Sequence, residues 1–340
     1  CTNAQVTIET TNALMVTSTL LGGLRGDLGQ WDFLQGILTM FNIVSLPNPE
    51  DPNQILFEPY EDVFVNDSFS GDIADLTLAT RGVAHDWTNK IDISQIKLET
   101  LTDINQTTVF QYAEDDDDYM FQNYKASFYG YLYGSLEYDA TLFNILEGST
   151  TIEVEAFAST VIKAYMPQYA SLITPAIYAL SEDGESEGFE NLPRICYNNG
   201  IKDLYTTPTD YWVPAQSGVV GAAFTKYLQF SHLTAIPTDV SSPPVASDTQ
   251  DYNFGPCQLI TGDGSSPAVN NLFNLYWAAY FNELYNPDTK IMTLKVNLNS
   301  ADINTFKFND TVFIKNREFR VNKIDYKPND LATVEFILIP

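Results

Sequence analysis

The stretch FKFNDTVFIKNREFRVNKIDY, residues 306–326, alternates apolar and polar residues, turns at Lys315-Asn316-Arg317-Glu318 and then alternates again. A period of two is typical of a strand with one buried face, and two such runs joined by a short polar turn predict an antiparallel hairpin. The runs on either side, 290–303 and 331–339, have strand-like composition. Because a hairpin's apolar face needs cover, we expect residues 288–340 to form a small β-barrel or sandwich.

Two segments have helical periodicity instead. GQWDFLQGILTMFNIVSLP (29–47) places Trp31, Leu34, Leu38 and Phe41 three or four residues apart, and NNLFNLYWAAYFNELYNP (270–287) shows the same wide apolar face. A proline lies at or just past the end of each segment, which favours termination there. We therefore expect two prominent helices, at about 29–45 and 270–285.

The rest of the chain is dominated by strand-like runs and long polar loops. We expect a β-rich, multidomain α+β fold. Its parts are an N-terminal α+β domain at 1–105, a β-rich middle domain with long loops at 106–268, and a helix followed by the small barrel at 269–340. No apolar run reaches the length that a membrane-spanning helix needs.

The charge of the chain is very uneven. Residues 251–340 hold 8 Lys and Arg against 10 Asp and Glu, so residues 1–250 carry −25 of the net −27. Binding to nucleic acid through phosphates requires a cationic surface, and this chain has the opposite. The acidity excludes ordinary nucleic-acid binding, but it suits a protein past which DNA must slide without sticking. A salty milieu would favour the same acidity through solubility alone.

No motif in the chain carries a recognisable reaction. The acidic run 114–118 is not an EF-hand loop, because Met120 and Ala126 occupy the positions that need Gly and Glu. An acidic turn is the simpler expectation there, and a different ion site at Asp115–Asp118 stays open. GESEG (184–188) matches G-x-S-x-G around Ser186, but acidic loop residues flank it. We expect structural roles for His85 and His232.

Cys1, Cys196 and Cys257 form neither a disulfide framework nor a zinc motif. We therefore predict a protein that is not an enzyme and that needs no cofactor and no metal.

Several segments taken together resemble a known class of proteins. They are WDFLQGILTMFN (31–42), ILFEPYEDVF (55–64), HDWTNKID (85–92), PRICYNNG (193–200), DYNFGP (251–256) and the closing run 270–328. The ensemble resembles tail and baseplate-hub-like structural proteins of tailed bacteriophages, including virion proteins of marine and Bacteroidota-infecting phages. It is strongest over 268–340 and weaker over 29–100.

The resemblance implies a virion protein of the phage tail. A tail-tube-like barrel would contribute to a ring, commonly a trimer with two such domains per chain, that contacts other tail proteins and lets DNA pass through an acidic lumen. Only one barrel-like segment, 288–340, is evident in this sequence.

The closing hairpin region is rich in cations. They are Lys307, Lys315, Arg317, Arg320, Lys323 and Lys327. We expect some of them to face an acidic surface of a neighbouring subunit, and the subunit-contact candidates are Lys315, Arg317, Arg320 and Lys323. On a strand, Arg317 and Arg320 lie on opposite faces, so they cannot all serve one contact. A solvated hairpin that protects a sheet edge with Lys is the simpler alternative.

A second interpretation comes from a different class. Cys1 is the residue with which a mature bacterial lipoprotein begins, so the chain could be an acidic surface lipoprotein that binds glycans with its Tyr-rich loops. A lipid on Cys1, or an upstream extension beginning with Met, would distinguish the two interpretations.

Overall fold

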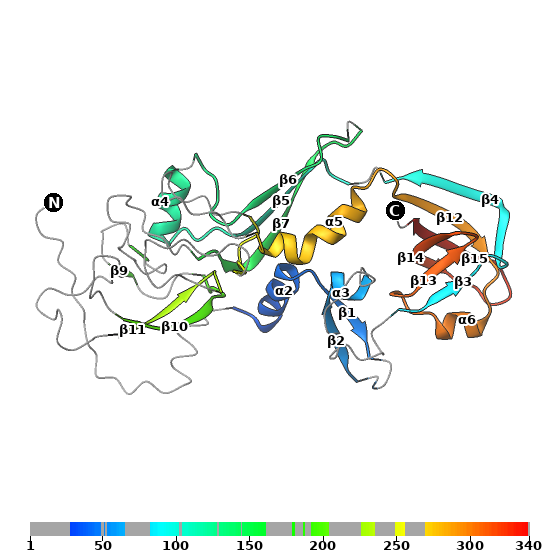
Figure 1. Ribbon diagram of the computed structural model, residues 1–340, viewed down its shortest axis with the longest axis horizontal. Helices are drawn as coiled ribbons and strands as arrows, with labels where there is room; N and C mark the ends of the chain where they lie inside the picture. Colours follow the sequence, from blue (N-terminus) through cyan, green and yellow to red (C-terminus); the bar gives the residue numbers. More distant parts are fainter. Residues whose placement is uncertain are drawn as a thin grey trace, which may run out of the picture. The chain divides into compact units, whose positions relative to one another are not determined.

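The computed structural model of the protein describes residues 28–48, 51, 53–64, 82–101, 104–127, 129–143, 145–160, 179–180, 186–187, 192–203, 226–234, 249–255 and 269–338. These residues divide between two compact units. Unit 1 lies within 1–40, 108–138 and 150–275, and unit 2 lies within 41–107, 139–149 and 276–340. The chain is α+β and strand-rich, as predicted (Figure 1).

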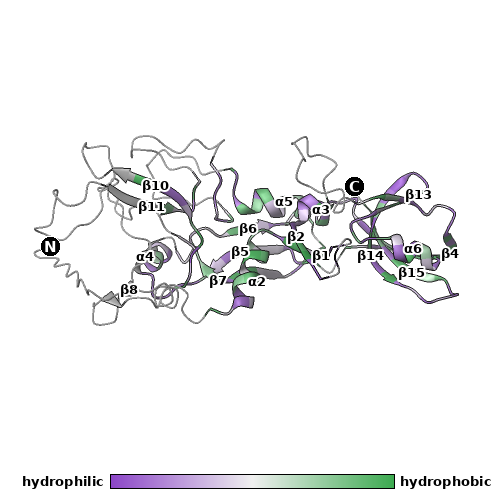
Figure 2. Ribbon diagram, turned by 90° about the horizontal axis from the view of Figure 1, so that it is seen from below, coloured by the Kyte–Doolittle hydropathy of each residue, from purple (hydrophilic) through white to green (hydrophobic). Residues whose placement is uncertain are grey.

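The predicted closing hairpin is confirmed at the centre of unit 2. Strand β13 (Thr311–Ile314) pairs antiparallel with β14 (Arg317–Asp325), and Ile314 stands opposite Arg317. Lys315 has a φ of 59°, in the left-handed region that tight hairpin turns require. Strand β14 carries both hydrophilic and hydrophobic residues along its length (Figure 2).

This hairpin belongs to a six-stranded sheet. In spatial order its strands are β3 (Ala84–Asp86), β13, β14, β15 (Ala332–Leu338), β12 (Lys290–Val296) and β4 (Ile91–Thr100). All neighbours are antiparallel except β3 and β13, which are parallel. Residues 84–100 therefore share a sheet with the C-terminus. The division into units accordingly differs from the expected consecutive domains 1–105, 106–268 and 269–340.

The sheet is curled but open. Its two edge strands follow each other in the chain, and the steps from Asp86 to Ile91 span at most about 17 Å. The edges of a flat sheet of six strands would lie about 24 Å apart, so the sheet must curl. No described strand links β3 to β4, however. Of the two forms expected over 288–340, a barrel or a sandwich, the closed barrel is wrong, and the expectation lacked the two strands that residues 84–100 contribute.

The concave side of the curl holds the core of unit 2. Trp87, in the connection between the two edge strands, is buried against the inward-facing residues of β12–β15. The buried members of this core are Trp87, Leu294, Val296, Leu298, Val312, Ile314, Phe319, Val321, Ala332, Val334 and Phe336. The alternate positions 319 and 321, 334 and 336, and 294 and 296 fill it, as the period of two predicts.

The strand expected over 290–303 ends early. Residues Ser300–Thr305 form a short helix, α6, instead. Asn299 caps it by accepting from the Asp302 N–H at 2.9 Å, while the Asp302 carboxylate accepts from the Asn299 N–H at 3.0 Å. This reciprocal capping box satisfies two of the donors that a helix start leaves open, which explains why a six-residue helix forms here.

The remaining elements of unit 2 are short. They are β1 (Ile43–Pro47), β2 (Ile55–Pro59), α3 (Tyr60–Phe64) and α5 (Ala278–Leu284). A π-helical turn at Phe273–Trp277 precedes α5. Helix α2 (Gln30–Met40) ends before the expected residue 45, because Asn42 adopts a φ of 46° and the β-branched Ile43 and Val44 begin β1.

Unit 1 contains most of a three-stranded sheet with the order β6 (Leu136–Asp139), β5 (Thr107–Ala113), β7 (Ser149–Ala158). Its other elements are α2, α4 (Tyr119–Ser127), the short pair β8 (Ala179–Leu180) and β9 (Ser186–Glu187), and the hairpin of β10 (Tyr197–Asp203) and β11 (Lys226–Ser231). One face of the three-stranded sheet is buried. The other carries exposed carboxylates from Glu137 and Asp139 on β6 and from Glu153 and Glu155 on β7.

Gly36 sets how closely α2 approaches β7. A Cβ at this position would lie 2.5 Å from Phe157 Cε2 and 3.0 Å from Ala156 Cβ. We expect Gly36→Ala to destabilise unit 1 by about 1–3 kcal/mol, because overpacking outweighs the gain of up to about 1 kcal/mol in helix propensity. Urea unfolding should show this loss. Gln35→Ala, on the exposed side of the same helix, is the control and should change stability by less than about 0.5 kcal/mol. A more stable Gly36→Ala variant would contradict the packing.

Candidate subunit-contact surface

The cations of the β13–β14 hairpin lie on different faces of the sheet. Phe319 and Val321 point into the core, so Arg320 lies on the opposite face of β14. The β14–β15 register shifts between Val321 and Lys323, and this bulge places Lys323 opposite Glu335.

Three of the four contact candidates are exposed. Lys315, Arg317 and Lys323 make no ion pair with any residue that the structure describes. The turn that carries Lys315 and Arg317 is fixed to the connection between β3 and β4, because the Lys315 N–H donates to Thr88 Oγ1 at 2.8 Å. We call Lys315, Arg317 and Lys323 the hairpin cations.

The fourth candidate, Arg320, is bound within its own chain. Its Nη2 donates to Glu283 Oε1 of α5 at 2.7 Å, and its Nη1 donates to Glu283 Oε2, which makes the pair bidentate. Nη2 also donates to the carbonyl of Phe64. The guanidinium carbon lies 5.8 Å and 5.5 Å from the ring centroids of Tyr60 and Phe64. Arg320 therefore secures α3 and α5 to the sheet, and the contact hypothesis retains the three hairpin cations.

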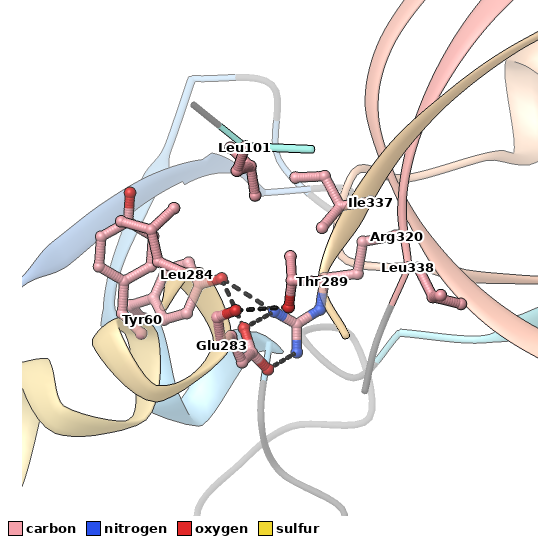
Figure 3. A pocket seen from close by; sticks show the side chains of 9 residues that line it. Tyr60, Leu101, Glu283, Leu284, Thr289, Arg320, Ile337 and Leu338 are labelled. Atoms are coloured by element: carbon pink, nitrogen blue, oxygen red, sulfur yellow. Dashed lines mark hydrogen bonds and ion pairs between the residues drawn. The ribbon is translucent and has the colours of Figure 1, made fainter. Parts of the chain in front are cut away.

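Tyr60 completes this ion pair (Figure 3). Its hydroxyl accepts from Arg320 Nη1 at 2.8 Å and donates to Glu283 Oε2 at 3.2 Å. Burial raises the pKa of Tyr60 well above its ordinary value. Arg320 opposes this rise, and Glu283 adds to it. The hydroxyl consequently keeps its proton, and with it the hydrogen bond to Glu283, throughout the neutral range.

A hollow beside the ion pair is lined mainly by apolar side chains, among them Leu101, Leu284, Ile337 and Leu338 (Figure 3). The charged groups on its wall, Arg320 and Glu283, are already bonded to each other. We therefore assign it no ligand.

The acidic run 114–118 is organised around an arginine. Arg194 Nη2 lies 2.7 Å from Asp115 Oδ2 and 2.7 Å from Asp118 Oδ2, and these side chains are only 2%, 2% and 0% exposed. Asp115 Oδ2 also accepts from the Leu192 N–H at 3.1 Å. The guanidinium thus occupies the position that a cation would take. The described residues contain no group of acidic, His or Cys side chains that could hold a metal ion.

Both histidines are held by a carboxylate. His232 is buried, with Nδ1 at 2.6 Å from Asp251 Oδ1 and Nε2 at 2.8 Å from the Tyr133 hydroxyl. His85 Nε2 lies 2.9 Å from Asp310 Oδ2. Asp310 also accepts from the Val83 N–H, so it ties the chain before β3 to the start of β13. These contacts support the structural roles expected for both residues.

Ser186 lies in β9, where its backbone pairs with Leu180. The structure describes the backbone of Ser186 and not its side chain. Cys1 and Cys257 also lie outside the described residues. Cys196 is partly buried, and burial raises the pKa of its thiol.

The sequence did not reveal the partners of Arg320 and Arg194. Glu283 is 37 residues from Arg320, and Asp115 is 79 residues from Arg194.

Comparison of the chain with models of protein families found no match, and a search of curated proteins found no relative. Among the described helices, none has the length and apolar character needed to cross a membrane.

Proposed function

We propose that this protein is a structural component of a bacteriophage tail: a hub or tail-tip ring protein that continues the tail tube and joins it to the tip or baseplate. The observation that carries the proposal is the separation of charge. A chain with a net charge of −27 presents three exposed cations on one hairpin, and none of them makes an ion pair with a described residue. The family resemblance of the closing segment points the same way.

A ring requires a heterologous contact, in which one patch of a subunit meets a different patch of the next. The hairpin cations, two at the turn and Lys323 farther along β14, supply the cationic side of such a contact. The exposed face of the three-stranded sheet, with Glu137, Asp139, Glu153 and Glu155, supplies a complementary one, which we call the acidic sheet face. We propose that the hairpin cations of each subunit contact the acidic sheet face of its neighbour, and that three subunits close the ring.

The acidity of the remaining surface has a role in this arrangement. Like-charge repulsion keeps DNA from adhering to a lumen through which it passes. The role is mechanical and calls for no cofactor, no metal and no catalytic residue. The protein would be located in the virion.

Charge reversal tests the ring contact. The full chain, measured by light scattering and negative-stain imaging, is expected to form open trimers. Lys315→Glu, Arg317→Glu and Lys323→Glu together should dissociate them, because each attraction becomes a repulsion.

The reversal Glu153→Lys with Glu155→Lys should also dissociate the ring alone and restore it when combined in the same chain with the hairpin reversal. A wild type that stays monomeric, or a hairpin reversal that leaves trimers intact, would overturn the proposal. Detection of a lipid on Cys1 by mass spectrometry would instead favour the surface lipoprotein.

A further inference from the structure

Strand β4 is an unprotected edge of the six-stranded sheet. One of its sides pairs with β12, and no described residue pairs with the other. It also exposes three large apolar side chains, with Ile93 66%, Ile96 54% and Leu98 59% accessible. Long edge strands with exposed apolar residues readily pair with a further strand, and native proteins usually protect them.

The strand has two arms. Its register with β12 runs evenly from Thr100, opposite Lys290, to Lys97, opposite Thr293, and then breaks. It resumes at Asp92, opposite Lys295, so β4 contains three more residues than β12 in this interval. The extra residues bend the strand (Figure 1). Residues 97–100 keep an even register with β12, and no described residue pairs with their outer edge; together with Ile96 we call this stretch the β4 arm.

The β4 arm, Ile96-Lys97-Leu98-Glu99-Thr100, is symmetric in character about Leu98. In an antiparallel pair, residues directly opposite each other project from the same face. If two copies of the arm pair about a two-fold axis at Leu98, the two Leu98 side chains meet. Lys97 of each copy then stands opposite Glu99 of the other, and Ile96 stands opposite Thr100.

The faces are compatible with this pairing. Leu98 stands opposite the core-facing Met292, and alternation places Ile96 on the same face. Lys97 and Glu99 share the other face, and within one chain their Nζ and Oε2 atoms lie 2.7 Å apart. The pair is exposed and weak in a single chain, so its charges are free to exchange partners across the axis. Each copy would contribute an apolar face, one Lys and one Glu, so that the dimer contains two complementary charge pairs.

We propose that a second copy of this chain pairs antiparallel with the β4 arm, centred on Leu98, so that the sheet continues across a two-fold dimer. Charge complementarity selects this occupant, because the arm carries both halves of its own recognition pattern. The contact uses other residues than the hairpin cations and the acidic sheet face. It does not depend on the proposed tail function.

Two single charge reversals test the proposal with the full chain in analytical ultracentrifugation. In addition to the trimer of the proposed ring, the wild type is expected to show a concentration-dependent association of copies in pairs through the β4 arm. Lys97→Glu places carboxylates opposite carboxylates, and Glu99→Lys places ammonium groups opposite one another. Each should weaken self-association at least about tenfold, because like charges directly opposite destabilise a strand pair. An equimolar mixture of the two variants should recover the dimer, since every carboxylate then faces an ammonium group.

The controls separate this dimer from the proposed ring. The triple hairpin reversal should leave the β4 dimer unchanged, and Leu98→Lys should abolish it while the circular dichroism spectrum stays that of the wild type. A wild type without self-association, single variants that associate as the wild type does, or a mixture that fails to associate would each overturn the proposal. A trimer insensitive to Lys97→Glu, with no further association, would overturn it while leaving the tail proposal standing.

Discussion

Replacement of Arg194 by methionine is expected to destabilise unit 1 by about 3–5 kcal/mol. The guanidinium lies at 2.7 Å from each of two carboxylates, and all three side chains are almost wholly buried. Removing it leaves Asp115 and Asp118 charged, close together and without solvent. It also removes the hydrogen bonds from Arg194 to the carbonyls of Leu192 and Ser159. Breaking a buried pair in this way costs far more than the intact pair contributes.

Hydrogen exchange followed by peptide can locate this loss. Faster exchange is expected in α4, which Asp118 caps by accepting from the Phe121 N–H at 3.2 Å, and in 192–203. The matched control is Lys125→Met, which breaks the more exposed ion pair with Glu114 of the same acidic run. It should cost less than about 1 kcal/mol. Adding Asp115→Asn and Asp118→Asn to Arg194→Met should recover part of the loss, because no buried charge then remains. An Arg194→Met variant as stable as the wild type would contradict the buried cluster.

Local patterns predicted the elements better than their partners. The alternation of 306–326 was sufficient for β13 and β14, since a period of two and a short polar turn are properties of adjacent residues. The pairing of β4 with β12 joins segments some 190 residues apart in the chain. An alternation of apolar and polar residues does not specify which distant strand a segment will pair with. The barrel was therefore predicted from four strands, when β3 and β4 complete the sheet.

The boundaries that the sequence missed have small local causes. Asn42 ended α2 through a left-handed conformation, and Asn299 with Asp302 started α6. Both signals are visible in the sequence, but each competes with a longer apolar pattern that suggested continuation. The capping box was the stronger signal, because it supplies hydrogen bonds that a continued strand would have lacked.

The contact candidates illustrate the same limit. Periodicity placed Arg317 and Arg320 on opposite faces of β14 and left open what lay over each face. In the structure, α3 and α5 cover Arg320, and its partner Glu283 comes from a helix whose apolar periodicity was noted without its charged residue. Arg320 is therefore bound within its own chain, whereas the hairpin cations, its neighbours in the sequence, make no ion pair with a described residue.

Replacement of Arg320 by methionine is expected to destabilise unit 2 by about 3 kcal/mol, because it leaves the Glu283 carboxylate poorly paired in a largely apolar setting. The two side chains are 11% and 22% exposed. Thermal unfolding should show the loss of stability, and faster hydrogen exchange in α5 and β14 should locate it. Tyr60→Phe is the control, since it removes one hydroxyl from the same cluster and should cost about 1 kcal/mol.

Two further variants decide what the ion pair is for. Adding Glu283→Leu to Arg320→Met should restore most of the stability, because Leu284, Ile337 and Leu338 offer apolar neighbours and buried pairs are often replaceable by apolar residues. This double variant should assemble like the wild type, since Arg320 and Glu283 bind each other rather than a neighbouring copy. A double variant that is stable yet fails to form trimers in light scattering would mean that Arg320 belongs to the subunit contact after all. If it assembles normally, Arg320 has no part in the proposed subunit contact.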